Sequence, residues 1–257
     1  MKLTKNMYKV ELKKSKDAVT GKMGLSWLMH AMKDFGVNKM ISDEYEKRSN
    51  RETDYFNKIM SAVMTRVAGG DRVEDVENLR VDGGLLESLG WDEIMSADTY
   101  LNLIKDKRTN AKLRRVNNKM IIKALRGLEE EDLTYDNDAT YFDSKKESAE
   151  YSYQKRKQFS GLTGCIAELG MINTVDFRRG NVSPQTGIMN QLRKTVAQVK
   201  AAGKRVKDFR SDSAAYRMDV MTYCDISEMN YFISADKDAA VRRTIEGIKA
   251  TQWRMLE

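Results

Sequence analysis

The chain has 257 residues, a length that suits one or two domains with enough apolar side chains to bury a core. Charged residues make up 32% and apolar residues 41%, which is typical of a folded globular protein and excludes a disordered one. The 45 lysines and arginines outnumber the 38 aspartates and glutamates, and the net charge of +7 is compatible with a polyanionic partner.

The rare residue types exclude several kinds of chemistry. A single histidine, His30, argues against a Ser-His-Asp triad and against histidine-rich metal sites. Two cysteines, Cys165 and Cys224, are too few for a disulfide scaffold or a cysteine zinc site and favour a reducing compartment. No apolar run approaches the ~20 residues that span a bilayer, and residues 1–10 lack a signal-peptide core. Any catalysis is therefore expected to rest on carboxylates.

The first half of the chain carries apolar residues at the three-and-four spacing of helices. Helices are predicted around residues 25–35, 55–67, 96–104 and 113–125, the third of them capped by Ser96 or Asp98. Asp82-Gly83-Gly84 and Leu89-Gly90 are expected to be turns. We predict a helical domain over residues 1–128, with the acidic run at 129–132 as the domain boundary.

From residue 129 onward the pattern changes to strands and then to alternating strands and helices. Strands are predicted at 133–142, 159–168, 171–177, 205–211 and 231–233. Helices are predicted to begin at Ser183-Pro184 and end at Gly203, and to cover 214–224 and 239–248. The order βββαβαβα is typical of a mixed sheet with helices packed on it, so we predict a second, α/β domain over residues 129–257.

Two aspartates stand out by their position. Asp138 lies in the first predicted strand and Asp212 at the end of the fourth. If those strands are neighbours, their ends bring together two carboxylates, the ligands that Mg²⁺ prefers. Two such ions about 4 Å apart activate a water or a 3′-hydroxyl and stabilise the leaving oxygen in phosphodiester chemistry. The alternative is that both are turn or cap aspartates, which are common at strand ends.

Several short motifs occur in one order along the chain. The second half holds Asp136-Asn137-Asp138-Ala139-Thr140, a basic and tyrosine-rich stretch at 147–161, Arg179-Gly180-Asn181 and Arg210-Ser211-Asp212-Ser213. The first half holds Thr20-Gly21-Lys22-Met23-Gly24-Leu25, Gly69-Gly70-Asp71 and the segment 79–90. Together they resemble the insertion-sequence transposases of the DDE type, and specifically the family called transposase DDE domain, group 1. The resemblance covers nearly the whole chain.

The resemblance implies an RNase H-like fold for the α/β domain and DNA transposition as the function. It implies that Asp138 and Asp212 are catalytic and hold Mg²⁺, with Mn²⁺ as a substitute, and that Asp136 is the alternative first ligand. The implied partners are the terminal inverted repeats of a transposon and target DNA, bound by a homodimer in a synaptic complex. The implied location is the nucleoid, in the cytoplasm of a prokaryotic-type cell.

Basic residues with tyrosines between them are candidates for DNA contact, because lysine and arginine neutralise phosphates and aromatic rings stack on unpaired bases. The alternative is a solvated loop and, for the arginines at 178–179, a hairpin cap. The candidates are Lys145, Lys146, Lys155, Arg156, Lys157, Arg179 and Arg210.

The sequence departs from the family pattern at two places. Ser213 stands where the family more usually has a glycine that allows a tight turn, so Asp212 is expected to shift slightly. The family's third acid is a glutamate beyond a further β-rich insertion, and neither Glu246 nor Glu257 fits that position. We therefore expect a C-terminally truncated transposase with an incomplete catalytic domain, which binds DNA without cutting it. The alternatives are a non-catalytic DNA-binding remnant and an unrelated Mg²⁺-dependent nuclease or phosphatase.

Overall fold

The computed structural model describes residues 18–45, 54–235 and 238–253. The chain divides into two compact units, Met1–Asn117 and Asn118–Glu257. The division falls inside helix α7 (Lys107–Arg126) and not at the acidic run that follows this helix. The assignment of a separate function to each half stays a prediction.

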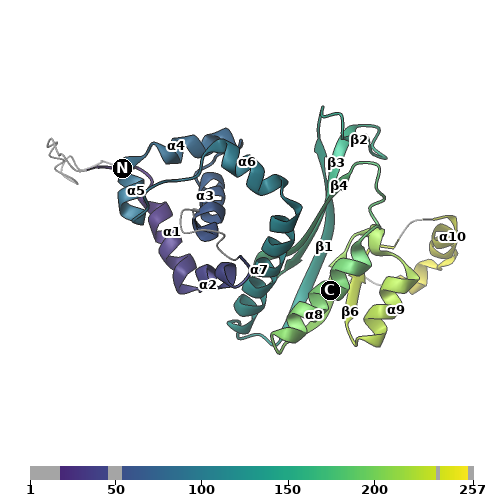
Figure 1. Ribbon diagram of the computed structural model, residues 1–257. Coiled ribbons are helices and arrows are strands. Elements are labelled where there is room, and N and C mark those ends of the chain that lie inside the picture. The colour runs from purple at the N-terminus through teal and green to yellow at the C-terminus, as the bar shows by residue number, and fades with distance from the viewer. Residues whose placement is uncertain (1–17, 46–53, 236–237, 254–257) are drawn as a thin grey trace, which may run out of the picture. The chain divides into compact units, whose positions relative to one another are not determined.

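The first unit is built from helices in the part that the structure describes, as the apolar spacing predicted (Figure 1). Its core contains Met29, Met60, Met64 and Leu85, which are all nearly inaccessible to solvent. The elements are α1 (Met23–Asp34), α2 (Val37–Ser42), α3 (Tyr55–Val67), η1 (Glu74–Val76), α4 (Glu77–Arg80), α5 (Gly83–Leu89), α6 (Ala97–Lys105) and the first part of α7.

The start of α5 corrects the turn expected at Asp82-Gly83-Gly84. Both glycines are helical, and Asp82 caps the helix by accepting a hydrogen bond of 3.0 Å from the backbone N–H of Leu85. A Cβ atom on Gly84 would lie 2.7 Å from the carbonyl carbon of Val19 and 2.8 Å from the backbone nitrogen of Thr20. The glycine is therefore needed for the close approach of two backbones rather than for a turn.

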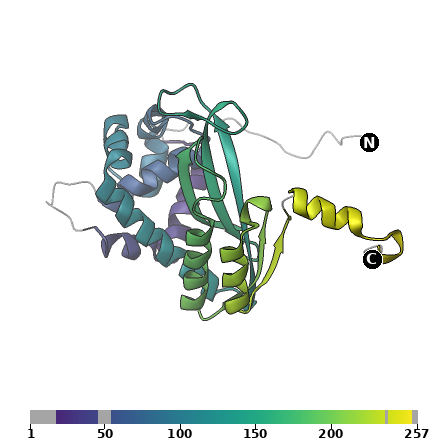
Figure 2. The same cartoon turned by 90° about the vertical axis from the view of Figure 1, so that its right-hand side faces the viewer.

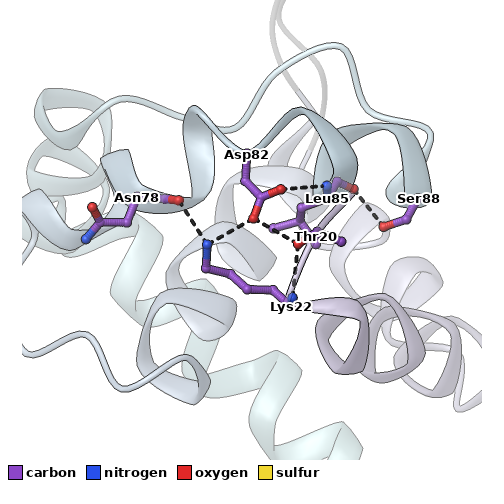
Figure 3. Close-up of polar contacts among 6 residues, drawn as sticks. All are labelled: Thr20, Lys22, Asn78, Asp82, Leu85 and Ser88. Carbon is purple, nitrogen blue, oxygen red and sulfur yellow. Dashed lines mark hydrogen bonds and ion pairs between the residues drawn. The ribbon is translucent and has the colours of Figure 1, made fainter. Parts of the chain in front are cut away.

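Asp82 also connects α5 to the segment before α1 (Figure 3). Its carboxylate accepts hydrogen bonds from the Thr20 hydroxyl at 2.8 Å and from Lys22 Nζ at 2.9 Å. Burial by itself would raise the pKa of Asp82, but the hydrogen bonds from Lys22, Leu85 and Thr20 outweigh it and lower this pKa. The sequence motif that begins at Thr20 thus has a structural use within the first unit.

The second unit is a mixed sheet with helices on one face. It contains the C-terminal half of α7, β1 (Asp132–Asp143), β2 (Glu150–Tyr151), β3 (Lys157–Ile166), β4 (Met171–Arg179), α8 (Ile188–Ala201), β5 (Arg205–Ser211), η2 (Ser213–Ala215), α9 (Met218–Ile226), β6 (Asn230–Ile233), α10 (Ala239–Gly247) and η3 (Ala250–Gln252). The five predicted strands are confirmed, and the two-residue strand β2 was not predicted. Among the described residues, no helix is long and apolar enough to cross a membrane.

The six-stranded sheet is ordered β2-β3-β1-β5-β6, with β4 also paired to β3. Strand β1 is central: it runs antiparallel to β3 and parallel to β5, and β6 is parallel to β5. Figures 1 and 2 show α8 and α9 side by side against the sheet. The core between the two layers includes Leu125 of α7, Leu133 and Tyr135 of β1, Leu192 of α8 and Phe209 of β5.

The predicted start of α8 at Ser183-Pro184 is wrong. The helix begins at Ile188, after Gly187 with a φ of 94°. The segment before it forms turns that are held from β4, because Arg178 donates hydrogen bonds to the backbone carbonyls of Ser183 and Thr186. The predicted end is confirmed, since α8 stops at Ala201 and Gly203 follows with a φ of 83°.

The predicted helix at 214–224 is also corrected: the 3₁₀ turn η2 comes first and α9 follows it.

Strand β5 contains an irregularity that decides which side chains face the helices. Its pairing with β1 shifts between Leu133, opposite Val206, and Thr134, opposite Asp208. Because of this shift, Val206 and Phe209 are both buried in the same core although an odd number of positions separates them. The alternation expected of a regular strand would have buried different residues of β5.

Candidate metal and DNA site

The two aspartates singled out by sequence occupy matching places on neighbouring strands. In the parallel pairing of β1 and β5, Asp136 lies opposite Arg210 and Asn137 lies opposite Ser211, where the ladder ends. Asp138 and Asp212 are the next residues on each chain segment, and both are exposed. The Ser211 hydroxyl donates a hydrogen bond of 2.9 Å to the backbone carbonyl of Asn137, which joins the two strands just before the aspartates.

Each of these carboxylates uses one oxygen in a local hydrogen bond. Asp138 Oδ1 accepts from the backbone N–H of Ala139 at 2.7 Å. Asp212 Oδ1 accepts from the backbone N–H of Ala214 at 3.0 Å and so caps η2. The alternative prediction that Asp212 is a cap residue is therefore confirmed. A carboxylate has a second oxygen, so this capping is compatible with ligation of a metal ion.

Asp136 has a different environment from Asp138, although both lie on β1. Its two oxygens accept hydrogen bonds from Arg210 Nε at 2.5 Å and Arg210 Nη2 at 2.7 Å. Pairing with Asp136 raises the pKa of the Arg210 guanidinium. Because both oxygens of Asp136 are bound to a cation, this carboxylate fits a metal ion less well than Asp138 does.

The residues after Asp212 form a turn without glycine. Ser213–Ala215 is a 3₁₀ turn, and the only non-glycine residues with positive φ in the described part of the chain are Lys155 and Glu228. Ala215 is fully buried in the core of the second unit. The departure from the family pattern at Ser213 is therefore accommodated by ordinary backbone geometry.

A buried polar network lies on the helix side of β1, directly beside Asp138. The Asn137 amide donates hydrogen bonds to Gln191 Oε1 of α8 at 2.8 Å and to the Thr163 carbonyl of β3 at 3.1 Å. Gln191 in turn donates to the Leu162 carbonyl at 3.0 Å. Gln191 was not predicted as a functional residue, and Asn137 was predicted only as part of the motif around Asp138. The sequence did contain a sign of this network: strand alternation and helix spacing place the amide side chains of Asn137 and Gln191 toward the core, where polar groups need hydrogen-bond partners.

Most of the basic candidates lie in the connection between β1 and β3, residues 144–156. Lys145, Lys146, Lys155 and Arg156 are exposed there, and Lys157 begins β3. Tyr151 and Tyr153 of the same connection expose 68% and 70% of their surface.

Arg179, at the end of β4, lies beside this connection. Its Nη1 is 3.8 Å from Glu150 Oε1 of β2. A Cβ atom on the next residue, Gly180, would be 2.4 Å from the Gln158 carbonyl oxygen and 2.5 Å from that of Glu150. The glycine of the Arg-Gly-Asn motif therefore lets the end of β4 pass close to β2 and β3. The sequence candidates thus form one group at 145–157 with Arg179, while Arg210 is apart from it and paired with Asp136.

The described residues contain no group of three or more histidine, cysteine, aspartate or glutamate side chains that could hold a metal ion. Glu246 lies on α10, whose described residues are all outside the core, and Glu257 lies outside the described residues.

A central β1, antiparallel to β3 and parallel to β5, with helices packed on the sheet defines an RNase H-like α/β protein. The chain belongs to the family described as transposase DDE domain group 1, whose model matches residues 3–256. None of the curated proteins compared with the chain matches it.

Three solved structures are similar to the chain at low sequence identity. One is the piggyBac transposase synaptic complex with hairpin DNA, with 12% identity and a TM-score of 0.40 over 90% of this chain and 54% of that one. Another is the Mos1 mariner paired end complex with Mn, with 10% identity and a TM-score of 0.27 over 88% and 82% of the two chains. The simian T-cell lymphotropic virus intasome in complex with PP2A regulatory subunit B56 gamma has 10% identity and a TM-score of 0.28 over 55% and 49%. The chain spans about half the length of the first and the third of these structures.

Proposed function

We propose that the chain binds DNA at transposon ends and that Asp138 and Asp212 hold the divalent metal ion needed for phosphodiester chemistry there. The observation that carries this proposal is the β1/β5 register, which makes the two aspartates the next residues after the last pair of two neighbouring parallel strands. Membership of the DDE transposase family supports the same assignment.

The donor set fits Mg²⁺, with Mn²⁺ as a substitute, because both ions bind carboxylate oxygens. When bound, such an ion lowers the pKa of a coordinated water or 3′-hydroxyl and stabilises the negative charge that develops at the phosphate. Asp138 and Asp212 would hold the ion from adjacent strands, and the Ser211 hydrogen bond to the Asn137 carbonyl keeps those strands together. Arg210 keeps Asp136 engaged and so leaves Asp138 as the ligand from β1.

DNA is the proposed partner of the basic group at 145–157 with Arg179. These side chains are on exposed connections, where they can approach phosphates without disturbing the core. The ion pairs of Arg156 with Asp143 at 3.5 Å and of Arg179 with Glu150 at 3.8 Å are long and solvent-exposed, so exchanging them for phosphate contacts costs little. We propose terminal repeats and target DNA as the substrates, and a second copy of the chain as the partner in a synaptic complex.

We further propose that the 257-residue chain binds DNA without cutting it efficiently. If Asp138 and Asp212 are the only ligands that the described residues supply, a second metal ion would be short of a protein ligand, and the stabilisation of the leaving oxygen would be weaker by several kcal/mol. The second candidate function is DNA binding alone, which needs only the exposed basic side chains at 145–157 and Arg179. The two candidates make different predictions about cleavage.

The test combines binding and cleavage on DNA that carries family-type terminal repeats, with Mg²⁺ or Mn²⁺ present. Affinity is expected to fall roughly 100-fold or more between 50 and 200 mM salt, because bound phosphates release counterions. Replacing Lys145 and Lys146 by alanine should weaken binding. The matched control removes the same charge from Lys194 and Lys200 of α8 and should change binding much less.

Absence of DNA binding at low salt would reject the proposed function. Robust strand cleavage that disappears in Asp212→Ala would keep the metal site but reject the proposal that cutting is inefficient.

A further inference from the structure

A pocket opens beside the proposed metal site, between the end of β1 and the connection to β3. Ala139 and Thr140, which line it, directly follow Asp138 on β1. The other lining residues are Tyr141, Phe142, Asp143, Tyr153, Gln154, Arg156 and Gln158. Tyr141 of β1 and Tyr153 of the connection pack edge to face, with their ring centroids 5.5 Å apart.

The wall of this pocket is held by a buried amide. Gln158 exposes 3% of its surface, accepts a hydrogen bond from the Ser152 hydroxyl and donates one of 2.7 Å to Asp143 Oδ1. The connection is closed on itself by a backbone hydrogen bond of 2.9 Å from Ser152 N–H to the Arg156 carbonyl. These bonds fix the segment that carries Tyr153, so its ring is presented from an ordered turn.

The chemistry of the lining fits a nucleobase. Tyr153 is 70% exposed and offers a ring for stacking, while Gln154 and Arg156 offer hydrogen-bonding groups for a base edge or a phosphate. A single exposed tyrosine would be ordinary surface. Here, however, the tyrosine lines a pocket within a basic connection. Residues of β1 that directly follow Asp138 line the same pocket.

We propose that this pocket binds one unpaired DNA base, stacked on Tyr153, next to the metal site proposed at Asp138 and Asp212. The proposal rests on the proposed function and adds a subsite to it. Duplex DNA has its bases stacked on one another, so the pocket acts only on a base at an overhang, a frayed end or another unpaired position. The flanking lysines contact backbone phosphates in either case.

The experiment compares the full chain with Tyr153→Ala, Tyr153→Phe and Tyr151→Ala. Tyr151 is a matched control, because it exposes 68% of its surface two residues away and does not line the pocket. Binding is measured by fluorescence anisotropy with a blunt duplex and with the same duplex extended by a short single-stranded overhang. We expect the unaltered chain to prefer the overhang by about tenfold and Tyr153→Ala to lose that preference. Tyr153→Phe and Tyr151→Ala should keep it.

Two results would overturn the subsite. In one, Tyr153→Ala and Tyr151→Ala weaken overhang binding equally. In the other, the unaltered chain binds both DNAs equally well. A chain that binds neither DNA would instead reject the proposed function together with the subsite, so the two failures are distinguishable. Circular dichroism of each variant shows whether it is folded, and the comparison of the two DNAs with the unaltered chain still tests the subsite if the alanine variant is not.

Discussion

At the scale of single residues, Asp136 and Asp138 show how one strand gives two carboxylates different environments. Both belong to the same sequence motif, and composition does not distinguish them. The β1/β5 register places Arg210 opposite Asp136, so this carboxylate is engaged by a guanidinium, whereas Asp138 lies beyond the last pair. The motif therefore predicted the strand and the candidate residues, but the choice between Asp138 and Asp136 as the proposed ligand needed the register.

Ser211 is predicted to position the metal ligands without touching a metal ion. Ser211→Ala removes its hydrogen bond to the Asn137 carbonyl, which costs about 1 kcal/mol of folding free energy. We expect Mn²⁺ affinity, measured by electron paramagnetic resonance, to fall roughly tenfold, as is usual when a residue that orients metal ligands is replaced.

The control is Ser144→Ala, which removes a hydroxyl that accepts a hydrogen bond from Lys146 N–H in the β1–β3 connection. It should leave Mn²⁺ affinity unchanged. Equal affinities in both variants would show that Ser211 has no positioning role.

Asp82 is predicted to stabilise the first unit through its cap and its contacts to Thr20 and Lys22. Asp82→Ala should lower the free energy of unfolding by about 2 kcal/mol, the sum of a lost N-cap and a lost charge-assisted hydrogen bond. Asp82→Asn keeps a capping oxygen and should cost less. Urea denaturation of the full chain measures both.

The same residue gives a pH dependence with a defined sign. Its folded-state pKa is lowered, so its contribution to stability is complete above the unfolded-state value of about 3.9 and is lost as the pH falls below that value. The stability difference between the unaltered chain and Asp82→Asn should therefore shrink between pH 6 and pH 3. A difference that stays constant would mean that the charge of Asp82 does not contribute.

At the scale of elements, local signals predicted most boundaries and long-range contacts decided the rest. The β3–β4 hairpin follows from two apolar runs around Gly170, and Ser96 caps α6 through the Thr99 N–H as its position indicated. Ser183-Pro184 looks like a helix start, but Arg178 of β4 holds that segment in turns. The irregular pairing of β5 could likewise not be predicted from the sequence, because it depends on the residues of β1 that lie opposite the strand.

Gly180 is predicted to be essential for the packing of β2 and β3 against the end of β4. Gly180→Ala places a Cβ atom 2.4 Å from the Gln158 carbonyl oxygen, so the backbones must separate. We expect a loss of about 2 kcal/mol in the free energy of unfolding, which is usual for overpacking.

Gly247→Ala is the matched control, since a Cβ atom there would meet nothing within 4 Å. Its effect on the free energy of unfolding, measured by urea denaturation, should stay within about 0.5 kcal/mol. If the two variants are equally stable, the close approach at Gly180 does not constrain the sheet.

At the scale of the whole molecule, the order of strands and helices along the chain was enough to predict the fold class. Three strands in succession followed by alternating helices and strands fit a mixed sheet, and the structure has β1 at its centre with α8 and α9 beside it (Figure 1). The family match over residues 3–256 agrees with the motifs read along the chain. The sequence could not predict the Asn137–Gln191 network, because its partners lie on β1 and α8, far apart along the chain.

The most direct test of the proposed metal site is a Mn²⁺ titration of the full chain followed by electron paramagnetic resonance. The unaltered chain, Asp138→Asn, Asp212→Asn and Asp136→Asn are compared under identical conditions. We predict that Asp138→Asn and Asp212→Asn each weaken Mn²⁺ binding by roughly tenfold or more, because each removes a ligand. Asp136→Asn should change it less than about threefold, because Arg210 already occupies both oxygens of Asp136. Loss of binding in Asp136→Asn, with binding retained in Asp138→Asn, would contradict the assignment and transfer the role in β1 to Asp136.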